Sequence, residues 1–544
     1  MPGRIAAPRF VPAAALAAAL AVACAPPPSE NAAPLVQAGG ETLQGSWDRG
    51  AGDHDQPAVA VFKGIPYAAP PVGPLRWRPP QPAVPRTGLQ TATAYGPGCY
   101  QAGGNVEYTR SIARALGQDP ALVPELGEIS EDCLYLNVWT ADPTAKAGEK
   151  RPVMMWIYGG GNLSGTSHEI PYDGANLARK GAVVVSINYR VNVFGFLAHP
   201  ALSAEDENGS SGNYGLLDQI AALRWTQDNI EAFGGDPQRV TIFGESAGGL
   251  NVTYLMASPL ARGLFHRAIS QSGGYLEPDH RTLAQAETDG EAVIRALAAG
   301  SDPAAWRARK PADLLTAFHE AGAEITNEIG PNVDGWLLED KATAVHARGE
   351  QHDVPLIAGN NADEWSLFRQ YYPTPPADQL REEIEEALGD LAAAAEPFYG
   401  IHEDRDVIQA NDLWNGDRWF FCAPRFLLNA HTPLTSPGYR YVFTRRLPTA
   451  GGDDLGAWHG AEIGYVFDNL DDEVYIPRQP WDDELAEKIS SYWVSFATNG
   501  DPNVDGLPEW PAWEPAQEPF LELGDSVQTG FGWRREACRL RARE

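Results

Sequence analysis

The sequence predicts an α/β fold in which a central, mostly parallel sheet is flanked by helices. Apolar strand-like runs alternate with helical runs from Val153 to Met256, a pattern typical of parallel strands joined by crossover helices. The helical run Leu216–Phe233 repeats apolar residues at the spacing of one helix face, and Gly234 ends it. With 544 residues, 43% of them hydrophobic, the chain can bury a large core.

The first strand of this core, Val153–Tyr158, runs directly into three glycines, Gly159–Gly161. A glycine loop lets backbone amides approach a substrate oxygen closely. Flexible linkers also contain consecutive glycines, but the position directly after an apolar strand favours a functional turn. A second strand is expected within Gly181–Tyr189.

The next strand leads into the pentapeptide Gly244–Gly248, which matches the pattern G-x-S-x-G. A strand-like run, Val240–Phe243, precedes it, and a helix-compatible run, Gly249–Met256, follows it. This context is that of a nucleophile elbow, a sharp turn that raises a serine hydroxyl above the sheet. Glycines flank the serine because a strand end packs there against a helix start, without room for a Cβ. The sequence therefore predicts Ser246 as a nucleophile; a helix-capping serine is the alternative.

A serine nucleophile needs a base, and after such an elbow the chain order is serine, then an acid, then histidine. Three histidines occur late in the chain: His402, His431 and His459. His402 lies in an acidic stretch typical of solvated surface, and His431 precedes a Thr-Pro turn. His459 lies in a glycine-flanked loop after the strand-like run Tyr439–Thr444. We therefore expect His459 to be the base.

The candidate acids are Asp363 and Glu364, which follow a short buried strand expected to end at Ala358 and a Gly-Asn-Asn turn. Open α/β sheets place their chemistry at the carboxyl ends of the strands. The residues alone do not choose between the two carboxylates. An acidic pair in this place is otherwise typical of a helix N-terminus.

Together these motifs resemble those of the type-B carboxylesterases, the family that includes the cholinesterases. The resemblance extends from about Gly45 to Cys538. It implies one α/β-hydrolase domain over residues 41–544, with helical insertions over the active site. We expect part of the insertions in the helix-rich, acidic stretch Leu283–Leu388. The matching stretches are Phe62–Pro71, Ser130–Asn137, Tyr158–Gly161, Asn188–Arg190, Phe243–Gly249, Asn361–Glu364 and His459–Ile463.

The resemblance implies a serine esterase that hydrolyses carboxylic esters through an acyl-enzyme, without a cofactor. The alternative is a catalytically silent, cholinesterase-like binding or adhesion protein, which the filled triad positions disfavour. A small-molecule ester is the expected partner. The implied roles are Ser246 as nucleophile, His459 as base, Glu364 rather than Asp363 as acid, Gly160, Gly161 and Ala247 as the oxyanion hole, and Glu245 and Ser272 as supports behind the triad.

The sequence departs from the cholinesterases at several positions. The family acid is usually followed by glycine, whereas Trp365 follows it here. The segment between Cys99 and Cys133 holds no tryptophan, although cholinesterases carry their choline-binding tryptophan there. Leu367 stands where cholinesterases have an aromatic residue. We therefore do not expect a choline ester as the dedicated substrate.

The N-terminus predicts export from a bacterial cell. Residues 1–23 have the form of a signal peptide, with two arginines before an Ala/Leu-rich run too short to span a membrane. Leu20–Cys24 resembles a lipobox, in which Cys24 would be lipidated; ordinary cleavage after Ala23 is the alternative. Residues 24–40, which include three consecutive prolines, are predicted to form a disordered tether. The expected location is periplasmic, outer-membrane-anchored or secreted.

The cysteine count agrees with export, because five cysteines leave one unpaired. The resemblance implies the disulfides Cys99–Cys133 and Cys422–Cys538, which leave Cys24 for a lipid. The spacings of common metal sites do not occur, so we predict no metal.

A net charge of −31 makes nucleic acid an unfavourable partner. An acidic surface that keeps the protein soluble explains this charge. Alternatively, the charge produces an electrostatic field that favours neutral or cationic substrates over anionic ones.

Overall fold

Strands at the centre of the molecule form one sheet with helices on both sides. Its strands are β3 (Ser46–Asp48), β4 (Val59–Pro66), β8 (Tyr135–Thr140), β9 (Arg151–Ile157), β10 (Val183–Ile187), β11 (Gly235–Glu245), β12 (Arg267–Gln271), β15 (Leu356–Asn361), β16 (Gly438–Phe443), β17 (Pro519–Leu523) and β18 (Val527–Phe531). Among the described residues the order is β18-β17-β16-β15-β12-β11-β9-β10-β8-β4-β3. Neighbours from β17 to β10 pair in parallel, and antiparallel pairs extend both edges. The predicted α/β fold is confirmed.

The computed structural model describes residues 32–50, 57–146, 148–273, 281–322, 329–402, 406–447, 455–474 and 476–543, together with Gly3 and Ile325. Residues Pro34–Glu544 form one unit. Apart from Gly3, the predicted signal peptide 1–23 lies outside the described residues, and so do Cys24 and the first part of the tether.

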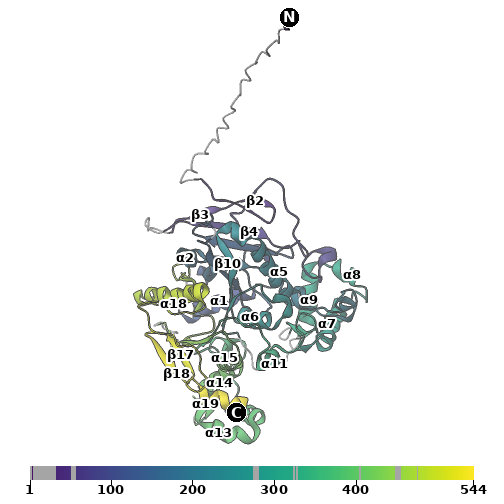
Figure 1. Ribbon diagram of the computed structural model, residues 1–544. Coiled ribbons are helices and arrows are strands. Elements are labelled where there is room, and N and C mark those ends of the chain that lie inside the picture. Colours follow the sequence, from purple (N-terminus) through teal and green to yellow (C-terminus); the bar gives the residue numbers. More distant parts are fainter. Residues whose placement is uncertain are drawn as a thin grey trace. The chain divides into compact units, whose positions relative to one another are not determined.

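Helices cover both faces of the sheet, and β10 is accordingly buried along its whole length. In Figure 1, α2 and α18 lie on one side of the central strands and α5 and α6 on the other. Among the described residues, no helix is both long enough and apolar enough to cross a membrane. The helices are α1 (Gly104–Ala115), α2 (Ala175–Arg179), α3 (Asn192–Phe196), α4 (Pro200–Ser203), α5 (Tyr214–Asn229), α6 (Ala247–Ala257), α7 (Leu283–Leu297), α8 (Pro303–Arg307), α9 (Pro311–Glu320), α11 (Ala342–Ala347), α12 (Ala377–Leu388), α13 (Ala392–Tyr399), α14 (Asp406–Gly416), α15 (Ala423–His431), α17 (Ile463–Phe467), α18 (Pro480–Asn499) and α19 (Arg535–Ala542).

The predicted disordered tether, residues 24–40, is too long, because its last residues, from Leu35 on, are folded. Strand β1 (Leu35–Ala38) pairs with β2 (Glu41–Gln44) as an antiparallel hairpin. The turn consists of Gly39 and Gly40, with φ of 59° and 77°, the left-handed backbone that a two-residue hairpin turn requires. Residues of β1 are alternately exposed and buried, so one face of the hairpin packs on the core.

The strand that carries the candidate acids is longer than predicted. It was expected to end at Ala358, but β15 continues to Asn361 because Asn360 and Asn361 pair with Val442 and Phe443 of β16. The Gly-Asn-Asn sequence is therefore strand, not turn. This extension places Asp363 and Glu364 directly beyond the carboxyl edge of the sheet.

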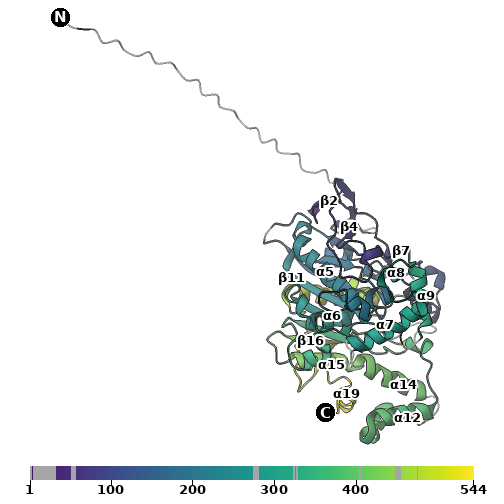
Figure 2. The ribbon, with the colours of Figure 1, turned by 90° about the vertical axis from the view of Figure 1, so that its right-hand side faces the viewer.

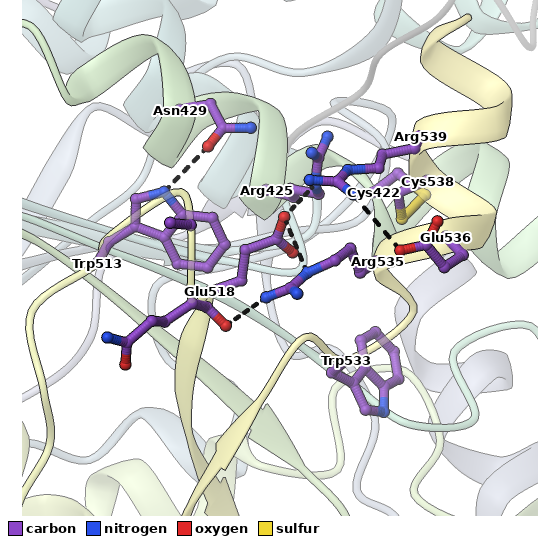
Figure 3. Close-up of polar contacts among 12 residues, drawn as sticks. Cys422, Arg425, Asn429, Trp513, Glu518, Trp533, Arg535, Glu536, Cys538 and Arg539 are labelled. Atoms are coloured by element: carbon purple, nitrogen blue, oxygen red, sulfur yellow. Dashed lines mark hydrogen bonds and ion pairs between the residues drawn. A yellow bond between two sulfur atoms is a disulfide. The ribbon is translucent and has the colours of Figure 1, made fainter. Parts of the chain in front are cut away.

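A disulfide and an ion cluster hold the C-terminal helix α19 against the core (Figure 3). Cys538 of α19 is bonded to Cys422, which directly precedes α15. The fully buried Glu518 accepts a hydrogen bond from Arg425 at 3.2 Å and lies 3.3 Å from Arg535. In both ribbon views α14 and α19 lie at the end where the chain terminates (Figures 1 and 2). The second disulfide joins Cys99 to Cys133.

Candidate active site

The elbow predicted around Ser246 is present between β11 and α6. Ser246 has φ 55° and ψ −124°, a strained backbone for a residue other than glycine. Within Val240–Met256, all of which the structure describes, Ser246 is the one residue that is not buried. The turn therefore lifts this side chain out of the core, as the G-x-S-x-G pattern predicts.

The glycines around the serine are required by close backbone packing. A Cβ on Gly244 would lie 2.5 Å from the carbonyl oxygen of Ile157, and one on Gly248 would lie closer still to the same oxygen. Real Cβ atoms are not found at such distances from backbone. The predicted reason for both glycines, the lack of room for a Cβ, is confirmed.

His459 and Glu364 form a buried pair at the carboxyl edge of the sheet. His459 Nδ1 lies 2.6 Å from Glu364 Oε2. The other carboxylate oxygen, Oε1, accepts hydrogen bonds from the Ser272 hydroxyl at 2.6 Å and from the Asn361 amide at 2.7 Å. Glu364 is completely buried, so these contacts fix the carboxylate and, through it, the imidazole ring.

Asp363 points away from the imidazole and anchors the loop that carries it. Its carboxylate accepts hydrogen bonds from the exposed Arg446 at 2.7 and 2.9 Å and from the amide of Ala457 at 2.8 Å. The Asp363 amide in turn donates to the Ala457 carbonyl at 3.0 Å. Asp363 thus contacts the His459 loop through backbone two residues earlier.

The second ring nitrogen of His459 faces the elbow. Nε2 lies 3.1 Å from Oε1 of Glu245, the residue before Ser246. Neither atom has a hydrogen-bond partner among the described residues. A Cβ on Gly159 would lie 3.0 Å from Ser246 Cβ and 2.8 Å from Glu245 Oε2, so the serine and this carboxylate share one small space. Nε2 is therefore the nitrogen left for a nucleophile.

Buried carboxylates control the protonation of His459. Burial alone disfavours the imidazolium, but Glu245, Glu364 and Glu462 together raise the pKa of His459 to about 9. Burial raises the pKa of Glu245 to about 8, even though the neighbouring imidazolium opposes the shift. Burial and the charge of Glu364 also raise the pKa of Glu462. The buried carboxylates therefore favour the protonated imidazole.

The glycine loop after β9 lies beside the serine. Gly160 and Gly161 have φ of 97° and 65°, values that favour glycine. Among the described residues, no acceptor is bonded to the backbone amides of Gly160, Gly161 or Ala247. Ala247 opens α6, and the first amides of a helix have no partner within it. These amides can therefore donate hydrogen bonds to a substrate oxygen on which negative charge develops, and so stabilise that charge.

Aromatic rings form one wall of the site. The rings of Phe420 and Phe368 lie 4.6 and 5.1 Å from that of His459, and they stack on each other at 5.7 Å. Trp365, the residue that replaces the usual glycine after the acid, packs on Phe368 at 5.2 Å and is 8% exposed. Phe420 belongs to a π-helical turn, Asp417–Phe421, a rare geometry that often occurs at functional sites.

The expected insertion stretch supplies only part of these walls. Within Leu283–Leu388, the described ring contacts with His459 come from the segment after Glu364, through Phe368. Phe420 of the same aromatic wall comes from the π-helical turn Asp417–Phe421, outside that stretch. Tertiary folding brings these segments over the site, and the local sequence gives no sign of it.

The other late histidines lie elsewhere. The side chain of His402 is 73% exposed and lies 3.6 Å from Glu396, in agreement with its interpretation as surface. His431 is buried at the end of α15.

Several residues of the site were not assigned by the sequence. Glu462 accepts hydrogen bonds from Gln271 at 3.1 Å and from the Asn361 side chain at 2.6 Å. Phe420 lies on the imidazole. Glu462 follows His459 in a matching stretch, which could have marked it, whereas no local signal marks Phe420 or Gln271.

Comparisons with known proteins agree with this geometry. The sequence model of the Carboxylesterase family matches residues 33–541. The chain is similar to the fumonisin B1 esterase of Sphingopyxis macrogoltabida, with 40% identity over 87% of this chain and 85% of that protein. It is 35% identical to the liver carboxylesterase of Sus scrofa, over 86% of each chain. A solved PNB esterase structure superposes with a TM-score of 0.79 at 30% identity, covering 93% of this chain and 99% of the other.

Proposed function

The chain belongs to the carboxylesterase family, and we propose that it hydrolyses carboxylic esters with Ser246 as nucleophile, His459 as base and Glu364 as acid. One observation carries these roles. His459 has Nδ1 bound to the buried Glu364 carboxylate at 2.6 Å, while Nε2 lies at the elbow without a hydrogen bond among the described residues. The family membership itself makes the chain a carboxylic ester hydrolase.

The mechanism follows from these positions. His459 Nε2 takes the proton of Ser246 as the serine oxygen attacks the ester carbonyl, and Glu364 stabilises the imidazolium through Nδ1–H. The amides of Gly160, Gly161 and Ala247 hold the oxyanion. The tetrahedral intermediate collapses, the bond to the alcohol breaks, and His459 returns its proton to the leaving oxygen. Water then adds to the acyl-enzyme by the same route and releases the acid and Ser246.

Apolar esters fit the wall of the site better than choline esters. Phe368, Phe420 and Trp365 offer aromatic surface next to His459. Leu367, in place of an aromatic residue, is buried in one cluster with Ile112 of α1 and with Leu116 directly after that helix. Fumonisin B1 is the natural ester to test first, because an esterase named for it is 40% identical to this chain.

The function is tested by hydrolysis of p-nitrophenyl esters of increasing acyl length and of fumonisin B1, with and without prior labelling by an organophosphonate. We expect the label on the Ser246 peptide, in one-to-one amount, with loss of hydrolysis in proportion. A label on another serine, with activity lost, would overturn the assigned nucleophile.

The pH dependence of kcat/KM should report the carboxylates around His459. The base must be neutral to accept a proton, and its pKa is raised to about 9. Activity should therefore rise with pH through an apparent pKa well above the ordinary histidine value of about 6.5. Glu245→Gln removes the nearest charge at Nε2 and should move this limb to lower pH by about one unit or more.

The matched control is Asp353→Asn. The Asp353 carboxylate bonds to Thr435 and Ser436 and is not among the charges that raise the pKa of His459. Its pH profile should coincide with that of the wild type. If the apparent pKa of the rise in kcat/KM is the same in Glu245→Gln as in the wild type, Glu245 does not hold the proton on His459.

We also propose that Cys24 is lipidated and holds the enzyme on a bacterial membrane. Support comes from the lipobox-like sequence Leu20–Cys24 and from the four other cysteines, which are paired in two disulfides. Two or three acyl chains anchor a protein stably, because each buried CH₂ contributes about 0.8 kcal/mol. Since β1 begins at Leu35, the tether is the stretch from Cys24 to about Pro34.

Intact mass spectrometry of the native protein decides between lipidation and simple secretion. We expect a mature chain that begins at Cys24 and carries the added acyl mass, in the membrane fraction. Cys24→Ser should move the active enzyme to the soluble fraction. If the native chain carries no acyl mass and is found in the soluble fraction, the lipid anchor is rejected and simple secretion is supported.

A further inference from the structure

Helix α1 (Gly104–Ala115) lies in the segment that the Cys99–Cys133 disulfide closes. This segment holds no tryptophan, and its helix carries other polar side chains toward the site. Asn105, Tyr108 and Ser111 follow one another at intervals of three residues, which places them along one face of the helix. Each of them bonds to a different loop of the proposed site.

Asn105 contacts the glycine loop. Its side-chain oxygen accepts a hydrogen bond from the Ser164 hydroxyl at 2.6 Å, and its side-chain nitrogen donates to Glu169 at 2.9 Å. A Cβ on Gly160 would lie 2.9 Å from the same Asn105 oxygen. Asn105 therefore packs directly on the backbone that carries the proposed oxyanion donors.

Tyr108 contacts the histidine loop. Its hydroxyl donates a hydrogen bond to the backbone carbonyl of His459 at 2.8 Å, across 351 residues of sequence. Burial raises the pKa of Tyr108 well above its ordinary value, and the charges of Glu245 and Glu364 raise it further. The hydroxyl therefore keeps its proton and remains a donor over the working pH range.

Ser111 and the apolar side of α1 contact the loop after the acid. Gln370 donates a hydrogen bond to the Ser111 hydroxyl at 2.8 Å. Leu367 of that loop and Leu455 and Trp458 of the histidine loop are buried with residues of α1. The members of α1 in this cluster are Tyr108, Ile112 and Ala115, joined by Leu116 directly after the helix.

We propose that α1 is a brace that fixes the glycine loop and the histidine loop relative to each other, with Asn105 and Tyr108 as positioning residues. The inference rests on the proposed roles of His459 and the glycine loop. The imidazole and the oxyanion donors must act on the same carbonyl group, and a displacement of about 1 Å can cost 10²-fold in rate. A helix bonded to both loops keeps the distance between the imidazole and the oxyanion donors constant.

The test compares Tyr108→Phe, Asn105→Ala and the double variant. Tyr108→Phe removes one hydroxyl and keeps the ring, so we expect kcat to fall about tenfold with KM within about twofold, because transition-state alignment is lost and substrate binding is not. The rate of organophosphonate labelling at Ser246 should fall by the same factor. The control is Thr109→Val, whose hydroxyl bonds to the Asn105 carbonyl within the helix; its kcat should match that of the wild type.

The double variant separates a brace from two independent contacts. Once either end is released, the two loops already move relative to each other. The double variant should therefore lose no more than about the larger single loss. Losses that multiply would overturn the brace, as would a Tyr108→Phe enzyme with wild-type kcat and labelling rate. Failure of the wild-type chain to label at Ser246 would instead overturn the proposed catalytic roles, so the two failures are distinct.

Discussion

Replacing Ser246 with alanine is expected to lower kcat by about 10⁶-fold, the cost of losing a triad nucleophile. The residue at this position has φ 55° and is partly exposed, and its side chain does not cap the helix that follows. Its amide donates to the carbonyl of Gln271 at 2.9 Å, and its carbonyl accepts from Leu250 at 2.8 Å. An alanine keeps both backbone bonds, so the fold should be retained.

The measurement is a comparison of purified wild type and Ser246→Ala at saturating ester, with thermal unfolding as the control for folding. The variant should unfold at a temperature close to that of the wild type and should take up no organophosphonate. Hydrolysis that survives in a folded Ser246→Ala protein would show that another residue is the nucleophile.

The central part of the fold and most of the site could be predicted from sequence because the information is local. The elbow needs Gly244 and Gly248 beside the serine, and both positions are closed to a Cβ by the Ile157 carbonyl. The run Val153–Tyr158 is a buried strand that leads into the glycine loop, and it appears as such in the residue pattern. Chain order then left three late histidines, and the glycine-flanked loop after a strand-like run singled out His459 among them.

Contacts between distant segments could not be predicted in the same way. The approach of Glu245 to Nε2 of His459 depends on two loops that meet only in the folded sheet, and a glutamate before the serine looks like any other polar residue of the motif. The bond from Tyr108 to the His459 carbonyl joins residues 351 positions apart. The tether was predicted too long for a different reason: the prolines indicated disorder, and the short strand Leu35–Ala38, whose sequence Leu-Val-Gln-Ala does not alternate between apolar and polar residues, gives no strand pattern.

Glu364→Gln is expected to lower kcat by about 10⁴-fold, and the hydrogen bonds around the carboxylate show why. Oε1 accepts from Ser272 and from the Asn361 amide, so in the variant the amide oxygen takes that place and the NH₂ group faces His459. An NH₂ group there makes Nδ1 an acceptor and moves the ring proton to Nε2, where the Glu245 carboxylate lies 3.1 Å away. That tautomer cannot accept the proton of Ser246, which is the origin of the loss in known triads.

Asp363→Asn is the matched control, one residue earlier and with the same chemical change. The asparagine oxygen can still accept from the Ala457 amide, and the charge pair that is lost is with Arg446, whose side chain is 56% exposed; such pairs contribute about 0–1 kcal/mol. We therefore expect its kcat to stay within about fivefold of the wild type. Both variants should be assayed at saturating ester, with kcat measured over pH. An equal loss in the two variants, or a larger one in Asp363→Asn, would show that the Glu364 carboxylate does not orient the base, despite its contact of 2.6 Å with Nδ1.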